Sequence, residues 1–395
     1  MFTKIKNKIS GSDNLLVNLI KEIVKQRFFG FYKNIYKTNY HRNVLISYIT
    51  SPIRRGLLKI HSNFLEMHII LEVFRSLKFN IDVADYTYEG KIDYNKYDLI
   101  FGFGSPFGKY FWSKNKKSLI TICYLTGSMA LFNQMERNRY LKERKGQNVI
   151  PRRNYYCKYL QESISMSDAI IITGNEWTES TVKPYNSKIF RVRLPVFLPN
   201  KEEITKIIQE KDFEKAKRNF LWFGSSGALH KGLDLCLDVF ANKENLFLHV
   251  CGPVDKESDF FELYKKELTA TKNIKYHGFV NIDSALFRNI IHSCAFSIFP
   301  SCSEGGGGSL LTCMAYGLIP IATKEASVNI EPDYGILLNS YRVEYISDVV
   351  MQLTNFSSDK LLSMSLEAME YTHKNHNAEA FRNDLINALN QLGVK

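Results

Sequence analysis

Short apolar runs alternate with longer stretches of helical periodicity along most of the chain. In the first half the runs predict strands, and residues 61–77, with hydrophobic side chains at helical spacing, predict a helix. Because the runs are apolar at nearly every position, both faces of their sheet must be covered, which is typical of parallel sheets. These strands are expected at residues 44–49, 81–84, 98–103, 119–125 and 169–173.

The alternation stops near residue 200, where prolines and a charged segment predict a linker, and then starts again. Strands are expected at 220–223, 246–251, 274–277, 296–299 and 319–322, with helices at 231–240, 260–268, 282–291 and 310–317. The pattern predicts an α/β fold with two doubly wound, Rossmann-like parallel sheets in tandem, facing across a cleft that binds the ligand. The expected domains are 43–199 and 200–375, with a terminal helix at 376–395 packing back on the first domain.

The segment 1–42 differs from the rest. Apolar residues at helical spacing over 15–24 predict a helix, and aromatic residues then alternate with basic ones as far as residue 37. Nine Lys and Arg stand against two acidic residues. Such a basic amphipathic segment is typical of a membrane interface, and equally of a helix that packs its apolar face on the following domain. Both interpretations stay open.

Net charge is unevenly distributed over the 395 residues. The chain carries +12, which favours an anionic partner. Residues 1–200 hold 32 Lys and Arg against 15 Asp and Glu, whereas residues 201–395 hold 20 against 25. The basic excess therefore belongs to the first half. Without a nucleic-acid-binding motif beyond the amino-terminal segment, an anionic membrane surface is the expected partner and nucleic acid is not.

Cysteine and histidine patterns give no sign of a disulfide framework or a metal site. The seven cysteines are scattered and contain no C-x-x-C pair, so reduced thiols in a cytoplasmic protein are expected. The spacing of His61 and His68 does not suit a metal, and no metal is expected. No apolar run is long enough for a signal sequence or a spanning helix, which predicts a soluble or peripheral protein.

Two loops carry candidate chemistry, each between a predicted strand and a helix. The first runs from Gly224 to Gly232 and contains Lys231, so its small residues and positive charge could bind an anion, although a plain turn explains it as well. The second contains four consecutive glycines preceded by Glu304. So many glycines suit a loop whose amides approach a diphosphate, with Glu304 accepting sugar hydroxyls. A flexible turn is the alternative.

Together these stretches resemble a known family. FLWFGSSGALHKGLDLCLDVF (220–240) and FPSCSEGGGGSLLTCMAYGLIPI (299–321) are similar to the donor-binding domain of GT-B glycosyltransferases of the retaining kind, glycosyltransferase family 4 or group 1. The resemblance implies that Gly224 and Lys231 bind phosphate and that Glu304 contacts the sugar. It assigns the diphosphate and sugar to Gly305, Gly306, Gly307, Gly308 and Ser309, and the nucleotide base to Phe279 and Val280.

The chain departs from the family pattern at several positions. Ser225, followed by Ser226, stands where the family usually has Arg, and Thr312 stands where a second Glu usually accepts the ribose hydroxyls. The Gly-Gly loop before the first helix is Asn63-Phe64 here. On the acceptor side, the strand end is expected to present its small polar residues, Thr126, Gly127 and Ser128.

The resemblance implies a hexosyltransferase-type glycosyltransferase that uses a UDP- or GDP-sugar as substrate and needs no other cofactor. In such enzymes the departing diphosphate can take the acceptor's proton, so Lys231 and Glu304 would serve charge stabilisation and orientation. An Asp-x-Asp triplet is absent, and Glu257-Ser-Asp259 is expected to be solvated. We expect a glycan or lipid-linked acceptor in bacterial surface polysaccharide (lipopolysaccharide, O-antigen or capsule) synthesis at the cytoplasmic face of the membrane. The alternative is a non-catalytic GT-B protein that binds a nucleotide sugar or glycan as an assembly partner.

Overall fold

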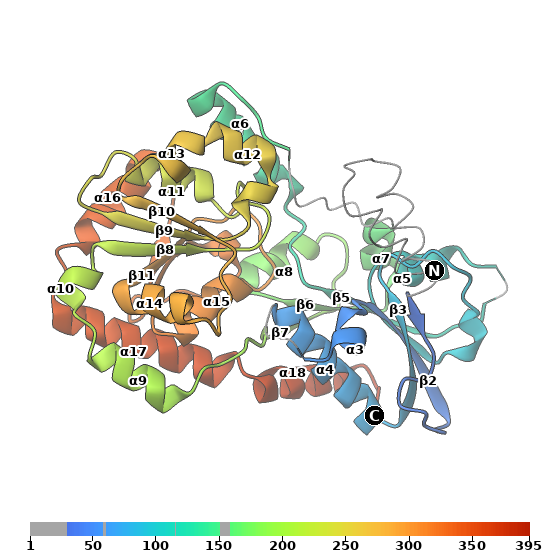
Figure 1. Ribbon diagram of the computed structural model, residues 1–395. Coiled ribbons are helices and arrows are strands. Elements are labelled where there is room, and N and C mark those ends of the chain that lie inside the picture. Colours follow the sequence, from blue (N-terminus) through green and yellow to red (C-terminus); the bar gives the residue numbers. More distant parts are fainter. Residues whose placement is uncertain (1–29, 58–60, 115, 151–158) are drawn as a thin grey trace, which may run out of the picture.

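Two parallel sheets form the framework of the computed structural model, which describes residues 30–57, 61–114, 116–150 and 159–395. Figure 1 shows the sheets side by side, each with helices on both faces. The predicted fold class, two doubly wound α/β sheets in tandem, is confirmed. The helix predicted around residues 15–24 lies outside the described residues.

The first sheet has the strand order β1-β3-β2-β4-β5-β6-β7, parallel throughout except that β1 pairs antiparallel with β3. Its strands are β1 (Phe31–Tyr32), β2 (Arg42–Tyr48), β3 (Phe79–Asp85), β4 (Leu99–Gly102), β5 (Ile120–Leu125), β6 (Ala169–Thr173) and β7 (Ile189–Val192). Val44 and Ile46 of β2 belong to one hydrophobic cluster and Leu45 to another. Both faces of the sheet are therefore buried, as the continuous apolar runs predict.

Helices cover both faces of this sheet. On one face lie α4 (Ser62–Ser76) and α18 (Ala378–Gln391), whose apolar side chains share the cluster of Val44. On the other lie α5 (Ser105–Trp112), α7 (Leu160–Met166) and α8 (Glu176–Val182), while the short α3 (Ser51–Arg55) precedes α4. The last helix of the chain thus packs against α4 of the first domain.

The second sheet has the order β10-β9-β8-β11-β12-β13 and is parallel throughout. Its strands are β8 (Asn219–Phe223), β9 (Phe247–Cys251), β10 (Ile274–Gly278), β11 (Phe296–Phe299), β12 (Ile319–Thr323) and β13 (Ile336–Leu338). Its helices are α9 (Lys201–Gln209), α10 (Phe213–Ala216), α11 (Leu233–Phe240), α12 (Ser258–Leu263), α13 (Lys265–Thr269), α14 (Ala285–Ser293), α15 (Gly308–Ala315), α16 (Val343–Leu353) and α17 (Ser358–Asn375).

One helix of the first half packs on the second domain. Helix α6 (Leu131–Lys145) follows β5 in the chain, yet Figure 1 places it beside α12 and α13. Arg137, only 2% exposed, lies 3.9 Å from Asp234, and Arg144 pairs with both Asp234 and Asp238 of α11. By sequence α6 falls within the expected domain 43–199, but its side chains pack on the second domain.

The described part of segment 1–42 belongs to the first domain. β1 forms the edge of the first sheet, and Ile35 and Tyr36 pack against the cluster on the α4 side. Within the described residues, no helix combines the length and the apolar character that crossing a bilayer requires.

Candidate active site

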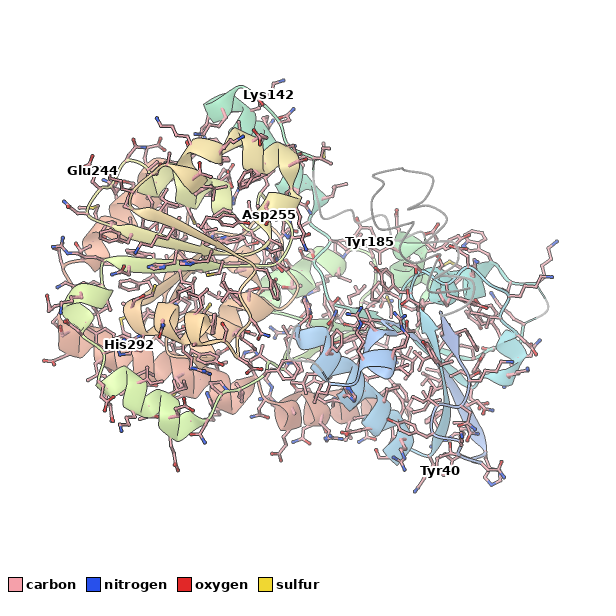
Figure 2. All side chains as sticks on the ribbon, in the orientation of Figure 1. Tyr40, Lys142, Tyr185, Glu244, Asp255 and His292 are labelled. Carbon is pink, nitrogen blue, oxygen red and sulfur yellow. The ribbon has the colours of Figure 1, made fainter. Side chains whose placement is uncertain are left out.

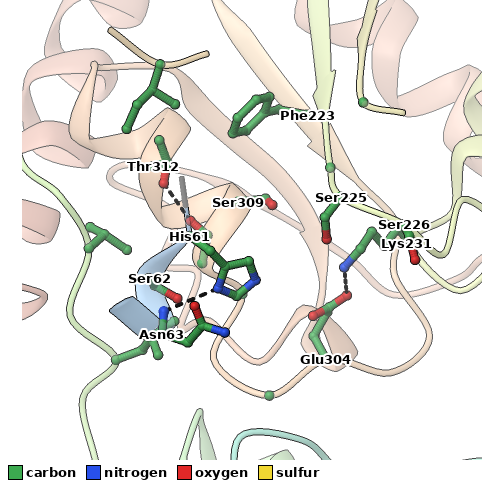
Figure 3. Close-up of a pocket in the computed structure, with 18 of the residues that line it drawn as sticks. His61, Ser62, Asn63, Phe223, Ser225, Ser226, Lys231, Glu304, Ser309 and Thr312 are labelled. Atoms are coloured by element: carbon green, nitrogen blue, oxygen red, sulfur yellow. Dashed lines mark hydrogen bonds and ion pairs between the residues drawn. The ribbon is translucent and has the colours of Figure 1, made fainter. Parts of the chain in front are cut away.

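A cavity of about 430 Å³ opens between the carboxyl ends of the two sheets (Figure 3). Its first-domain wall is built by the start of α4 and the ends of β2 and β5, and its second-domain wall by the loops after β8, β10 and β11. Of the residues predicted for the site, those that line the cavity are Gly224, Ser225, Ser226, Lys231, Phe279, Val280, Glu304, Gly305, Gly307, Gly308, Ser309, Thr312 and Thr126. Gly306, Gly127 and Ser128 do not line it.

The loop after β8 is held from behind by a buried carboxylate. Glu257, 4% exposed, accepts hydrogen bonds from the backbone amides of Gly227 and Ala228, the latter at 3.2 Å to Oε2. The expectation that Glu257 is solvated is therefore wrong, because its charge is satisfied by amides inside the turn. Those two amides are engaged, and the residues that this loop presents to the cavity are Gly224, Ser225, Ser226, His230 and Lys231.

Lys231 and Glu304 form a buried ion pair at the centre of the second-domain wall (Figure 3). Their side chains are 8% and 11% exposed, and Nε2 of His230 lies 3.3 Å from Oε1 of Glu304. Pairing stabilises both charges in this buried position, because an unpaired buried charge would carry a large desolvation cost. The pair joins the two loops that the sequence singles out, although 73 positions separate its members.

The glycine loop packs tightly against the first domain. A Cβ on Gly305 would lie 2.1 Å from the carbonyl oxygen of Thr126 and 2.3 Å from Cα of Gly127, which leaves no room for a side chain. Thr173 of β6 donates to the Gly305 carbonyl at 2.8 Å. Gly306 has φ +108°, a conformation that favours glycine, and faces Leu194 rather than the cavity. Part of this loop thus serves the contact between domains.

Helix α15 begins at the cavity and carries two of the predicted residues. Ser309 lies in its first turn and Thr312 in the next, both on the lining. The hydroxyl of Thr312 donates to the carbonyl of Gly308 at 2.8 Å, so its oxygen remains able to accept a hydrogen bond. Backbone amides and the positive end of the helix dipole favour an anion here.

The far end of the cavity is apolar. Phe223, Val280 and Ile282 line it together with Phe279, whose side chain is 66% exposed. An aromatic side chain beside a partly apolar wall suits a flat ring such as a nucleotide base.

The start of α4 forms part of the first-domain wall, a role that the sequence analysis did not assign to it. His61 caps this helix: its Nδ1 accepts the backbone N–H of Asn63 at 3.2 Å. Ser62 lies next to the glycine loop, since a Cβ on Gly308 would be 3.3 Å from its Oγ. Desolvation and the positive charge of Lys231 lower the pKa of His61, which favours its neutral ring, although part of the residue stays exposed to solvent.

The first-domain wall also contains a buried carboxyl, Glu66, which lines the cavity. It accepts hydrogen bonds from the hydroxyls of Tyr124 at 2.7 Å, Tyr48 at 3.1 Å and Ser62 at 3.2 Å. Burial raises the pKa of Glu66, while these hydrogen bonds lower it in part. Burial also raises the pKa of both tyrosines well above their usual range, so they remain donors.

On the acceptor side, the strand end predicted to face the cleft is only partly in it. Thr126 lines the cavity, Gly127 lies against Gly305, and Ser128 is fully buried with its hydroxyl unpartnered among the described residues. The residues that sequence reasoning missed are His61 and Glu257. The available signal for the first was a polar residue at the first position of the predicted helix 61–77, and the second had none.

Comparisons with known proteins agree with this arrangement. Residues 204–378 match the family described as "Glycosyl transferases group 1". Sucrose-phosphate synthase from Thermosynechococcus elongatus superposes with a TM-score of 0.62 at 11% identity, covering 89% of this chain and 98% of that one. No curated protein sequence matches the chain.

Two further structures are similar in fold. TarM of S. aureus, in complex with fondaparinux, alpha-GlcNAc-glycerol and UDP, has a TM-score of 0.52 and 14% identity over 74% of this chain. The chain spans 55% of the length of TarM. WaaG, described as a glycosyltransferase involved in lipopolysaccharide biosynthesis, has a TM-score of 0.54 and 11% identity, covering 88% of this chain and 98% of that one. The fold is GT-B.

Proposed function

We propose that the protein transfers a sugar from a nucleotide-sugar donor to a glycan or lipid-linked acceptor with retention of configuration. The observation that carries this proposal is the buried Lys231–Glu304 pair, which lies beside the glycine loop in the cavity between the domains. A cation next to the start of α15 suits a diphosphate, and the carboxylate beside it suits sugar hydroxyls.

The donor would lie along the second-domain wall. Its base would contact Phe279 and Val280, its diphosphate would reach Lys231 and the amides at the start of α15, and its sugar would reach Glu304. As the acceptor hydroxyl attacks the anomeric carbon, the bond from that carbon to the diphosphate breaks. Lys231 would stabilise the charge that develops on the leaving group, which is where electrostatic catalysis is most effective.

Retention is supported by how the carboxyl groups of the cavity are engaged. Glu304 is paired with Lys231. Glu66 is buried in the first-domain wall, and its oxygens accept hydrogen bonds from Tyr48, Tyr124 and Ser62. Neither is placed as an open general base toward the acceptor. The departing diphosphate can itself take the acceptor's proton from the same face, so no base and no metal ion are required by this route.

A UDP- or GDP-sugar is the proposed donor. The UDP bound to TarM supports the first of these. Thr312, with one free acceptor position, would contact the ribose less extensively than a carboxylate would.

We further propose a role in bacterial surface polysaccharide synthesis at the cytoplasmic face of the membrane. WaaG, whose described role is in lipopolysaccharide biosynthesis, supports the pathway class, and the basic first half of the chain supports an anionic surface. Sedimentation of the whole chain with anionic and with neutral vesicles tests the second point. Equal binding to both would count against it.

A non-catalytic GT-B protein is the second candidate. The hydroxyl of Thr312 is used inside its own helix, and Ser225 adds no charge to the anion site, so donor binding without turnover would be consistent with these two positions.

The test is incubation of the protein with UDP- and GDP-sugars and candidate glycan or polyprenyl-linked acceptors, with EDTA present. Release of nucleoside diphosphate that depends on the acceptor, with an α-linked product from an α-linked donor, is expected. Binding of a donor without any acceptor-dependent release would support the non-catalytic alternative.

A further inference from the structure

The cavity has little positive charge for a diphosphate. Among the described residues that line it, Lys231 is the only Lys or Arg, and its charge is already offset by Glu304. Each phosphate of a nucleotide sugar carries a negative charge that needs hydrogen-bond donors in a site closed to water. The second-domain loop after β8 offers fewer amides than its sequence suggests, because Glu257 occupies two of them.

His61 stands opposite, on the first-domain wall. It lines the cavity, and Figure 3 shows its ring turned toward the side where Lys231 and Glu304 lie. Lys231 and Glu304 line the same cavity from the second-domain side. Its neighbour Ser62 approaches Gly308, so the start of α4 lies against the start of α15 at the edge of the cavity.

The helix cap fixes which nitrogen of His61 carries the proton. Because Nδ1 accepts the N–H of Asn63, a neutral ring holds its proton on Nε2. The same bond fixes the orientation of the ring, so Nε2–H is a donor that is oriented before any ligand arrives. Desolvation and Lys231 lower the pKa of His61, which favours this neutral form of the ring.

We propose that His61 donates a hydrogen bond from Nε2 to the diphosphate of the donor, so that the leaving group is bound between a first-domain imidazole and the second-domain Lys231. This inference rests on the proposed function and adds to it a specific contact from the opposite domain. Loss of the imidazole should weaken the hold on the diphosphate and leave the nucleoside end unaffected, since that end lies against Phe279 and Val280.

Three variants separate this role from capping. His61→Ser keeps a good N-cap for α4 and removes the reach of the ring, whereas His61→Ala removes both. His292→Ser is the matched control, because this exposed histidine of α14 does not line the cavity. Each is compared with the unaltered chain by calorimetric titration with the UDP- or GDP-sugar it binds and with the corresponding nucleoside, and by thermal unfolding.

We expect His61→Ser and His61→Ala to lose roughly ten-fold or more in affinity for the nucleotide sugar, the size of a hydrogen bond to a charged group, with nucleoside affinity unchanged. His292→Ser should bind as the unaltered chain does. If His61→Ser binds the nucleotide sugar normally and only His61→Ala is weakened or less stable, His61 is a cap and the inference is overturned. Equal loss for nucleotide sugar and nucleoside would overturn it too. If the unaltered chain binds no nucleotide sugar, the proposed function itself fails.

Discussion

The two walls of the cavity are built in different ways. The second-domain wall consists of two loops at the ends of buried strands, and its chemistry is concentrated in short runs around Lys231 and Glu304. The first-domain wall takes His61 from the start of α4, Tyr48 from β2 and Tyr124 behind it from β5. Runs of this kind are recognisable in a sequence, whereas a wall gathered from separate elements becomes visible only in the fold.

The arrangement of side chains differs as well. Figure 2 shows side chains filling both domains. At the cavity, the second-domain wall carries a charged pair, Lys231 and Glu304. The first-domain wall carries the neutral ring of His61 and the carboxyl of Glu66, whose protonated form burial favours. The four predictions that follow test this division of roles.

The largest effect is expected at the charged pair. Lys231→Ala removes the charge that stabilises the leaving group, and Glu304→Ala removes the carboxylate that orients the sugar. Each should therefore lower sugar transfer by about 10²–10³-fold or more. Circular dichroism should show that the fold is kept. Transfer to a lipid-linked acceptor that survives both changes would show that the second-domain wall is not the catalytic one.

A second effect concerns α6, the helix of the first half that packs on the second domain. Arg137 of α6 donates to the carbonyl of Pro300, at the base of the glycine loop, with both terminal nitrogens at 3.0 Å. Arg137→Met should cost about 3 kcal/mol or more in the free energy of unfolding, since Asp234 keeps a buried charge with one partner fewer. Arg139→Met, on the exposed side of α6, is the control and should change stability by about 0.5 kcal/mol at most. Equal effects would mean that α6 is not anchored through Arg137.

A third comparison lies within the glycine loop. Gly305→Ala places a Cβ against the backbone of Thr126 and should destabilise the closed arrangement by about 1–3 kcal/mol. Gly308→Ala meets only the side chains of Leu194 and Ser62, at 3.3 Å from Leu194 Cδ2 and from Ser62 Oγ, and should be tolerated in the fold. Urea unfolding and donor titration of the two variants measure this. A Gly308→Ala variant that unfolds as easily as Gly305→Ala would contradict the assignment of Gly305 to the domain contact.

The smallest effect is expected at Glu66. A carboxyl whose pKa is raised in the folded protein binds protons more readily there than in the unfolded chain, so its contribution to stability is lost as pH rises through the folded pKa. Glu66→Gln, which stays neutral and keeps the tyrosine hydrogen bonds, should therefore be more stable than the unaltered chain at pH 8, by under about 1.5 kcal/mol. The difference should shrink as the pH falls toward 4.5. A gain that is constant with pH would rule out this titration as its cause.

Much of the framework could be predicted from the sequence, for physical reasons that particular residues make plain. Val44, Leu45 and Ile46 are all apolar because both faces of β2 are covered, and the same logic locates most strands of both sheets. The short β7 and β13, with partly exposed residues, lack this signal. The partner of α6 also could not be predicted, because Arg137 and Arg144 meet Asp234 only when the two domains come together.

The candidate site, like the framework, could be predicted from the sequence only in part. Lys231 and Glu304 stand beside glycines that must approach another chain segment, and this glycine-rich composition can be recognised in the sequence. The burial of Glu257 depends on the path of the loop after β8, and the role of His61 depends on a helix N-terminus that lies against a second helix at the edge of the cavity. Neither can be read from spacing along the chain.

The central claim is that the cavity binds a nucleotide sugar through Lys231, and a screen of nucleotide sugars by thermal shift tests it most directly. We predict that at least one UDP- or GDP-sugar raises the unfolding temperature, with a stabilisation of about 2.7 kcal/mol at a hundred times its Kd, and that Lys231→Ala abolishes the shift. Stabilisation by none of the nucleotide sugars, or a shift that is undiminished in Lys231→Ala, would contradict it.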